Sequence, residues 1–371
     1  MFGCEPSPFH APSVAIHLLN TGLLALFTRR LTGDVWITLA AVLLFCAQPL
    51  YIEAVVWVGA ITDLLPATWF LLTLWLHLVW LQTRATWARL GSFVVFVTCL
   101  GTHESSVTVL PMMIALDALL AWPARADVTG WLRVRERRYA VFAVMLTLYL
   151  GLAYVVNSRS YIVRDGYYTV GWHMVENTFS YFAGMYIGRR RLLWHLGVAL
   201  VLALLAWRGT PRVRFLIVWM FVTLAPVSLF TWGTASRYLY VPAAAFALLL
   251  ADRILTGARR LLVSGVPQRV VATAGVLVVA VLVGRFAIFA RGGVTDFRRL
   301  ARPYEHFTAV VRAADQAAPG AVIRVTAQDV YGIGEPFVVP AAETALCRAG
   351  VQVVVDPPLI PPATAVLPST P

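Results

Sequence analysis

The two residues of this sequence best suited to catalysis are carboxylates. Glu53 and Asp63 lie in the stretch Gln48 to Leu65, QPLYIEAVVWVGAITDLL, between two long apolar runs. A carboxylate beside hydrocarbon is costly and is usually kept for a function. Asp63 could bind a metal or orient an acceptor, or it could stabilise the N-terminus of the following helix. Glu53 could form the wall of a substrate site or hydrogen-bond a neighbouring helix.

Two further polar groups interrupt apolar runs. Arg237 begins RYLYVP, where a guanidinium can bind two phosphate oxygens at once, and Tyr240 one turn later can donate a hydrogen bond. The alternative for this pair is an interfacial helix anchor. His103 and Glu104 stand together in THESS, where His103 could contact phosphate and Glu104 could hold the local backbone. Adjacent residues do not share a helical face, so they are not a metal pair.

A third group is mainly aromatic and lies in the longest loop between apolar runs. It consists of Tyr167, Tyr168, Trp172, His173 and Glu176. These side chains could line a substrate entrance, but such stretches are more often amphipathic helices in the membrane interface. We favour the interfacial interpretation from the sequence.

The elements that position these residues are membrane helices. The chain has 371 residues, 60% hydrophobic and 13% charged, whereas soluble domains are roughly half apolar and a quarter charged. Several apolar windows reach the roughly 18 residues that a helix needs to cross a bilayer. All thirty basic residues are arginines dispersed among short loops. That dispersal is typical of topology determinants and excludes nucleic acid as a partner. The absence of lysine indicates a GC-rich, bacterial source.

Hydropathy predicts an all-α polytopic membrane protein with about ten crossings, a hairpin of two short helices among them. The expected apolar segments are 11–28, 35–57, 61–82, 90–121, 139–157, 192–207, 214–231, 236–251 and 270–290. Segment 90–121 has basic residues at both ends, so we expect it to cross twice and to break near Gly101 to Glu104. Both termini and all the polar groups above then lie on the outer face of the cell membrane.

The sequence predicts three parts. Residues 1–290 form the transmembrane domain, residues 291–356 a small external α/β segment, and residues 357–371 a Pro-rich disordered tail. Within the second part we expect strands at 321–326 and 351–355 and a helix at 341–349. An outer N-terminus with no preceding span is awkward, so we expect an upstream helix to be missing.

Four stretches together resemble one family. They are HAPSVAIHLLN with His10, His17 and Asn20, then QPLYIEAVVWVGAITDLLPATWFLL, THESSVTVLPMMIALD and ASRYLYVPAAAFALLLA. In this order they resemble motifs of the transmembrane and tetratricopeptide-repeat O-mannosyltransferases and their bacterial relatives, which belong to the GT-C superfamily. Such enzymes typically move a sugar from a polyprenyl-phosphate carrier to an acceptor at the outer or lumenal face.

The resemblance assigns roles to the polar residues. It implies that Asp63 and Glu53 are catalytic, and that the phosphate site contains Arg237, Tyr240, His103 and Glu104. It implies as partners the bilayer, a polyprenyl-phosphate-linked hexose and a protein or glycan acceptor. No cofactor is certain, although a divalent metal is possible.

The sequence also departs from the family. The family's first helix and acidic first external loop have no counterpart, and tetratricopeptide repeats do not follow. His103 replaces a lysine of the family, and Ile61-Thr62 replaces an Arg-Lys pair. Two other functions therefore stay open: a non-catalytic remnant or accessory subunit that binds the carrier, and a transporter for a lipid-linked solute.

Overall fold

The structure, a computed structural model, describes residues 7–49, 52–121, 128–187, 192–333 and 335–356. It divides into two compact units, one spanning His10–Arg291 and a C-terminal unit that begins at Gly292. The boundary falls inside one long helix, α13. The candidate site lies entirely in the first unit.

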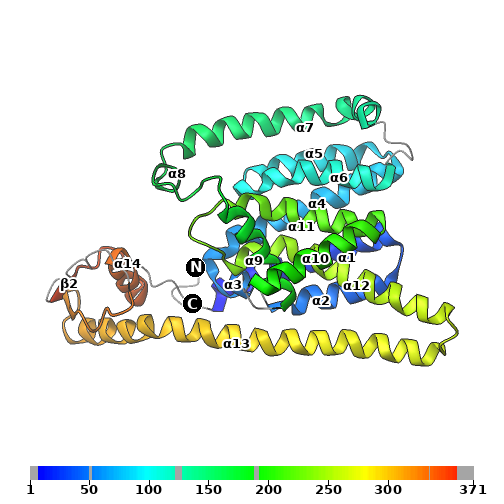
Figure 1. The fold of residues 1–371 in the computed structure, drawn as a ribbon. Coiled ribbons are helices and arrows are strands. Elements are labelled where there is room, and N and C mark those ends of the chain that lie inside the picture. Colours follow the sequence, from blue (N-terminus) through cyan, green and yellow to red (C-terminus); the bar gives the residue numbers. More distant parts are fainter. Residues whose placement is uncertain (1–6, 50–51, 122–127, 188–191, 334, 357–371) are drawn as a thin grey trace. The chain divides into compact units, whose positions relative to one another are not determined.

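The first unit is built from helices (Figure 1). In chain order they are α1 (Ser7–Thr32), α2 (Val35–Ala47), α3 (Ile52–Val56), the 3-10 helix η2 (Val58–Ala60), α4 (Ile61–Thr83), α5 (Thr86–Leu100), the 3-10 helix η3 (Glu104–Thr108), α6 (Val109–Ala121), α7 (Val128–Asn157), α8 (Tyr161–Arg164), α9 (His173–Ile187), α10 (Leu192–Arg208), α11 (Pro211–Ser228), the 3-10 helix η4 (Ser236–Leu239), α12 (Tyr240–Val263) and the first part of α13 (Gln268–Ala317).

Six helices in the described residues are long and apolar enough to cross a membrane. They are His10–Thr32, Ile61–Thr83, Arg135–Asn157, Pro211–Ser228, Ser236–Val263 and Gln268–Ala317, and shorter apolar helices lie between them. The chain is therefore a multi-pass membrane protein. The total of about ten crossings stays a prediction.

Two helix boundaries differ from the expected ones. The segment expected at 35–57 is broken, because α2 ends at Ala47 and Gln48 takes an extended conformation with ψ 120°. Pro49 follows, and a residue before proline is pushed out of the helical region. By contrast, α13 does not end near residue 290 but continues as one helix to Ala317. The helix break expected near Gly101 is present, because α5 ends at Leu100 and η3 begins at Glu104.

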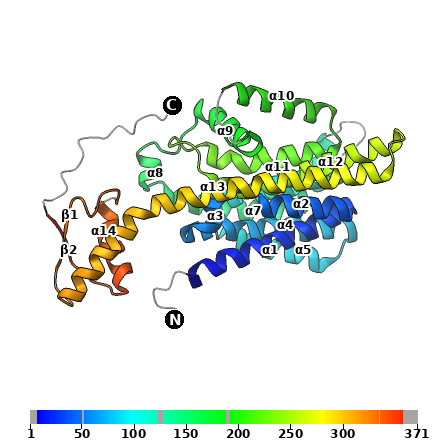
Figure 2. The same ribbon diagram turned by 90° about the horizontal axis from the view of Figure 1, so that it is seen from below.

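The core of the first unit is a continuous apolar cluster around α4, α11 and α12. Trp219 is fully buried, and Phe27, Phe70 and Phe215 pack around it with ring centroids 5.4 to 5.9 Å apart. On α12, a run of buried alanines at 243–245 and 247 permits close helix approach. Figure 2 shows α9 and α10 beside α11, with α1, α4 and α5 on the other side.

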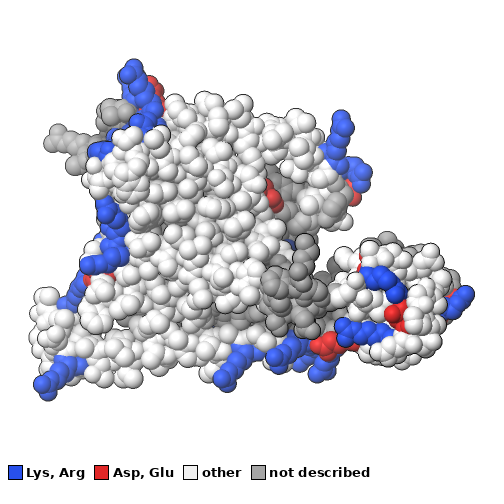
Figure 3. Space-filling view, turned by 180° about the vertical axis from the view of Figure 1, so that it is seen from behind, with Lys and Arg blue, Asp and Glu red and all other residues white. Residues whose placement is uncertain are grey.

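The outer surface of the first unit is suited to lipid. On α7 the exposed side chains include Val144, Leu148, Leu152 and Val155. In Figure 3 a broad area of this unit carries no charged side chain, and arginines gather along one margin. Apolar side chains that face outward in the middle of helices match hydrocarbon, and arginine at the ends matches the headgroup region.

The C-terminal unit contains β1 (Ile323–Thr326), α14 (Glu335–Leu346) and β2 (Val353–Asp356). The two strands pair in parallel, with Ile323 opposite Val353. Phe307 and Val311 of α13 are fully buried against this small sheet. Each strand overlaps the range expected from the sequence, and the helix begins six residues earlier than expected. The external location of this unit stays a prediction.

A buried polar cluster attaches α7 to the bundle. Asp117 of α6 is 1% exposed and accepts hydrogen bonds from Arg135 Nε at 3.1 Å and from Tyr139 Oη at 2.9 Å. Arg138 also pairs with this carboxylate. His77 of α4 lies 3.4 Å from the Tyr139 hydroxyl. One buried carboxylate therefore connects α6 with two arginines of α7.

We expect Asp117→Ala to destabilise the protein by about 3 kcal/mol, because removing one partner of a buried ion pair leaves the other charges uncompensated. The measurement is thermal unfolding of the purified protein in one detergent. The control is Asp296→Ala, which removes a carboxylate 71% exposed and 3.9 Å from Arg299; surface pairs contribute about 0 to 1 kcal/mol. Equal melting temperatures for the two variants would contradict a structural role for Asp117.

Candidate functional site

A pocket lies at the end of the bundle where three helix starts meet. Helix α4 begins at Ile61, and η3 fills the break between α5 and α6. The 3-10 helix η4 begins at Ser236 and leads directly into α12. The pocket is lined by residues from these elements and from α11, among them Asp63, Pro66, His103, Ser106, Arg237 and Tyr240. Four of the six predicted site residues thus line a single pocket, although they are up to 177 positions apart in the sequence.

The guanidinium of Arg237 lies between the two predicted catalytic carboxylates. Its Nη1 donates to Glu53 Oε1 at 2.7 Å, and its Nε is 3.6 Å from Asp63 Oδ2. Glu53 Oε2 also accepts from the backbone N–H of Arg237 at 3.4 Å. The side chains of all three are largely buried, with Asp63 the least exposed at 11%. Glu53 therefore fixes both the backbone and the side chain of Arg237.

Aromatic rings complete the surroundings of Arg237. The guanidinium carbon lies 4.7 Å from the Tyr238 ring centroid and 5.3 Å from that of Trp57. Its Nη2 donates to the Tyr238 hydroxyl at 3.1 Å. Stacked rings and carboxylates on several sides restrict the side chain to one position. Such a fixed cation is preorganised for an anionic ligand.

His103 and Glu104 play different parts. The His103 ring accepts from the backbone N–H of Ser105 at 3.1 Å, so it caps the start of η3. Its Nδ1 also lies 3.7 Å from Glu104 Oε2. The charges of Arg237, Glu104 and Glu53 all act on Asp63. Glu104 is mostly exposed and does not line the pocket.

Tyr240 lies in the pocket wall, but its hydroxyl is engaged within the bundle. It is 2.8 Å from His17 Nδ1 and accepts from Asn20 Nδ2 at 3.2 Å. Asn20 also donates to the carbonyl oxygen of Leu64 at 3.1 Å. From the sequence we expected this hydroxyl to bind phosphate, but in the structure it binds two side chains of α1. Through Asn20, α12 and α1 are also linked to the start of α4. The histidine and asparagine of the α1 motif therefore support the residue next to Asp63.

The predicted aromatic loop closes against the connection between α11 and α12. Thr169 N–H donates to Leu229 O at 3.1 Å, and Thr231 N–H donates to Tyr167 O at 3.0 Å. Burial raises the pKa of Tyr168, and the negative charge of Glu104 raises it further. Trp172 remains 79% exposed. The loop thus packs against the connection between α11 and α12, while Trp172 faces outward as an interfacial residue would.

Sequence reasoning missed several residues that complete the site. Tyr238 holds the Arg237 guanidinium, yet only its proximity to Arg237 could have singled it out. Ser105 and Ser106 line the pocket with hydroxyl groups, and a 3-10 helix in the break explains why they face inward. His17 and Asn20 were noted as part of a motif, but their partners come from α4 and α12 and no local pattern reveals them.

The site does not fit a metal ion well. Within the described ranges, no three His, Cys, Asp or Glu side chains are placed to hold one. Arg237 occupies the space between Glu53 and Asp63, where a cation would otherwise bind. One guanidinium nevertheless faces two carboxylates, those of Glu53 and Asp63. An incoming anion would therefore gain from a second positive charge at this site.

Comparisons with known proteins give one distant similarity. No family model matches the chain, and no solved structure matches it. The chain is 32% identical over 123 residues to the protein O-mannosyl-transferase TMTC2 of Mus musculus and to that of Homo sapiens. It is 29% identical over 131 residues to Tmtc2 of Drosophila melanogaster. The matched segment covers 32% of this chain but only 15% of each mammalian relative. This chain is thus related at a distance to part of proteins named as mannosyltransferases.

Proposed function

We propose that the chain acts in polyprenyl-phosphate-dependent sugar transfer at the external face of the membrane. A hexose, most simply mannose, moves from the lipid carrier to a protein or glycan acceptor. The observation that carries the proposal is the guanidinium of Arg237 held between Glu53 and Asp63 in a pocket at the bundle end. The similarity to proteins named O-mannosyl-transferases supports the same class of reaction.

The reaction is a single inverting displacement. An acceptor oxygen forms a bond to the anomeric carbon while the bond from that carbon to the carrier phosphate breaks. The acceptor proton passes to a carboxylate, and the phosphate leaves with the bonding electrons. A base must reach the acceptor and a cation must face the phosphate, and both must be in place before the reaction.

The two carboxylates divide this work. Asp63 lines the pocket and is 3.6 Å from the guanidinium, so it is the group placed to accept the proton. Glu53 is outside the pocket lining and binds Arg237 at 2.7 Å. We therefore assign Glu53 to positioning and Arg237 to the departing phosphate. The hydroxyls of Ser105 and Ser106 are further donors in the wall.

The location follows from the charge of the two bundle ends. The pocket lies at the starts of α4 and α12, whereas arginines gather near the end of α1, the start of α11 and the second half of α12. Arginine-rich connections favour the cytoplasmic side. We therefore propose that the pocket faces outward from a bacterial inner membrane.

A second candidate is carrier binding without transfer, as an accessory subunit would do. The specific observation is the size of the pocket, about 30 Å³. This is room for about two water molecules. A hexose is far larger than this volume, so the helix starts that line the pocket would have to move apart to admit it. Binding of the carrier and transfer of its sugar therefore have to be measured separately.

Arg237→Ala should lower hexose transfer by at least about 100-fold, the effect of removing a preorganised charge at a leaving group. Arg237→Lys should recover only part, because an ammonium cannot bind two oxygens as a fork. The assay follows radiolabelled hexose from polyprenyl phosphate to acceptor in proteoliposomes, with elution volume as a check of folding. The control is Arg164→Ala, which removes an exposed arginine of the outer loop. Full transfer by Arg237→Ala would refute the assignment.

Asp63→Asn and Glu53→Gln should fail in different ways. Without its base, Asp63→Asn should lose kcat while donor KM changes less than about threefold. Loss of the carboxylate that holds Arg237 should make Glu53→Gln act mainly on donor KM. Identical losses in both variants would contradict the division of roles. If wild-type protein binds the carrier through Arg237 but transfers no sugar, the accessory function is correct instead.

A further inference from the structure

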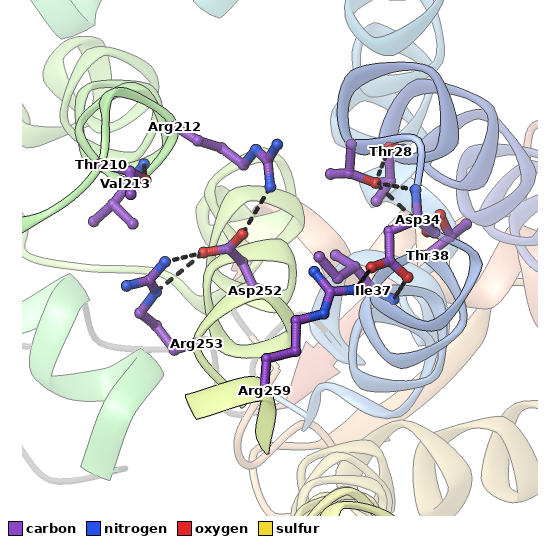
Figure 4. A network of polar contacts seen from close by, with 11 residues as sticks. Thr28, Asp34, Ile37, Thr38, Thr210, Arg212, Val213, Asp252, Arg253 and Arg259 are labelled. Carbon is purple, nitrogen blue, oxygen red and sulfur yellow. Dashed lines mark hydrogen bonds and ion pairs between the residues drawn. The ribbon is translucent and has the colours of Figure 1, made fainter. Parts of the chain in front are cut away.

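A second built polar site lies at the opposite end of the helix bundle. Here α1 ends at Thr32, α11 begins at Pro211, and α12 carries Asp252 and Arg253. Asp252 is 2% exposed and accepts from Arg212 Nη1 at 3.0 Å and from Arg253 Nε at 3.0 Å. Figure 4 shows the two guanidinium groups approaching the carboxylate from different sides.

The two arginines keep donors for a further partner. Their side chains are about a third exposed, at 32% for Arg212 and 28% for Arg253, although the carboxylate between them is buried. In the described part of the chain Arg212 donates through Nη1 alone, so its Nε and Nη2 are not used. A buried carboxylate that holds two arginines at fixed positions leaves their outer N–H groups directed toward a ligand.

A cavity of about 370 Å³ adjoins these arginines. This volume falls within the range of small-ligand sites. One part of the wall is polar, with Thr210 and Thr256 beside the arginines. The other part is apolar and consists of Leu31, Leu119 and Leu120. The cavity therefore combines a cationic end with a hydrocarbon wall.

The net charge of the cavity is positive. Arg212 and Arg253 face a single carboxylate, which leaves one positive charge uncompensated. Asp34, the other acid in the same view, is paired with Arg259 and accepts the N–H groups of Trp36 and Ile37 (Figure 4). It therefore does not neutralise the cavity. The N-terminus of α11, capped by Thr210, adds a partial positive charge at the same place.

We infer that this cavity binds the headgroup phosphate of an anionic membrane phospholipid. Arg212 and Arg253 bind the phosphate oxygens as charge-assisted donors. An acyl chain lies along the leucines at the ends of α1 and α6, of which Leu120 is 44% exposed. Charge complementarity selects an anion, and the apolar wall selects one that carries a hydrocarbon chain. The inference is independent of sugar transfer, because this site and the Arg237 pocket share no residue.

The test is lipid binding by the purified full chain, with native mass spectrometry as the readout. Phosphatidylglycerol and phosphatidylcholine are titrated separately into the detergent-solubilised protein. Wild type should retain phosphatidylglycerol about tenfold more tightly than phosphatidylcholine. Arg212→Gln should remove most of this preference, since one lost charge-assisted contact weakens binding by about tenfold.

Two variants control for charge and folding. Arg214→Gln removes the same charge from the same helix turn, but Arg214 donates to Ala206 O and Trp207 O and does not line the cavity. It should bind phosphatidylglycerol as wild type does. The double variant Arg212→Gln and Asp252→Asn keeps the net charge that the cavity has in wild type, so its loss of the preference would show that the Arg212 donors themselves bind the lipid.

Three outcomes would overturn the inference. One is equal phosphatidylglycerol binding by wild type and both Arg212 variants. Another is equal loss in Arg212→Gln and Arg214→Gln, which would indicate a diffuse surface charge. The third concerns the source of the phosphate: if inorganic phosphate or glycerol 3-phosphate competes as well as the lipid at equal concentration, the site binds a free phosphate and the hydrocarbon wall has no role.

Discussion

The contact between Arg237 and two carboxylates is the interaction on which the pocket end of the bundle depends. A guanidinium and carboxylates that are mostly withdrawn from water lose hydration, and their mutual attraction offsets this loss only when the geometry is good. Glu53 meets the requirement by binding both the backbone N–H and Nη1 of Arg237. The connection from α2 to α4 is thereby joined to η4. The pocket exists because these ends are held together.

Irregular backbone is the second feature of this end. The segment before α4 consists of short helical turns, among them α3. The 3-10 helix η3 lies between α5 and α6, and a second 3-10 helix, η4, directly precedes α12. Each break exposes backbone groups that need partners, and polar side chains supply them. His103 caps η3, and Asn20 binds the Leu64 carbonyl. His103, a residue of the candidate site, therefore also completes the backbone hydrogen bonding at the start of η3.

The two ends of the bundle differ in charge. At the pocket of Arg237 one arginine faces two carboxylates, whereas at the opposite end two arginines share the single carboxylate of Asp252. The end with two arginines therefore carries the larger excess of positive charge.

The sequence by itself determined the membrane class, most apolar helices, the break at Gly101 and the residues worth examining, because hydropathy, proline, glycine and isolated charges act locally. The hydropathy prediction passed over the end of α2, although Pro49 marks it locally, and it could not place the continuation of α13, which depends on packing within the C-terminal unit. Only the tertiary structure decided that Arg237 meets Glu53 and Asp63, and that the Tyr240 hydroxyl belongs to His17 and Asn20. The reason is physical: such pairs join residues far apart in the sequence, and helix packing alone sets which side chains face each other.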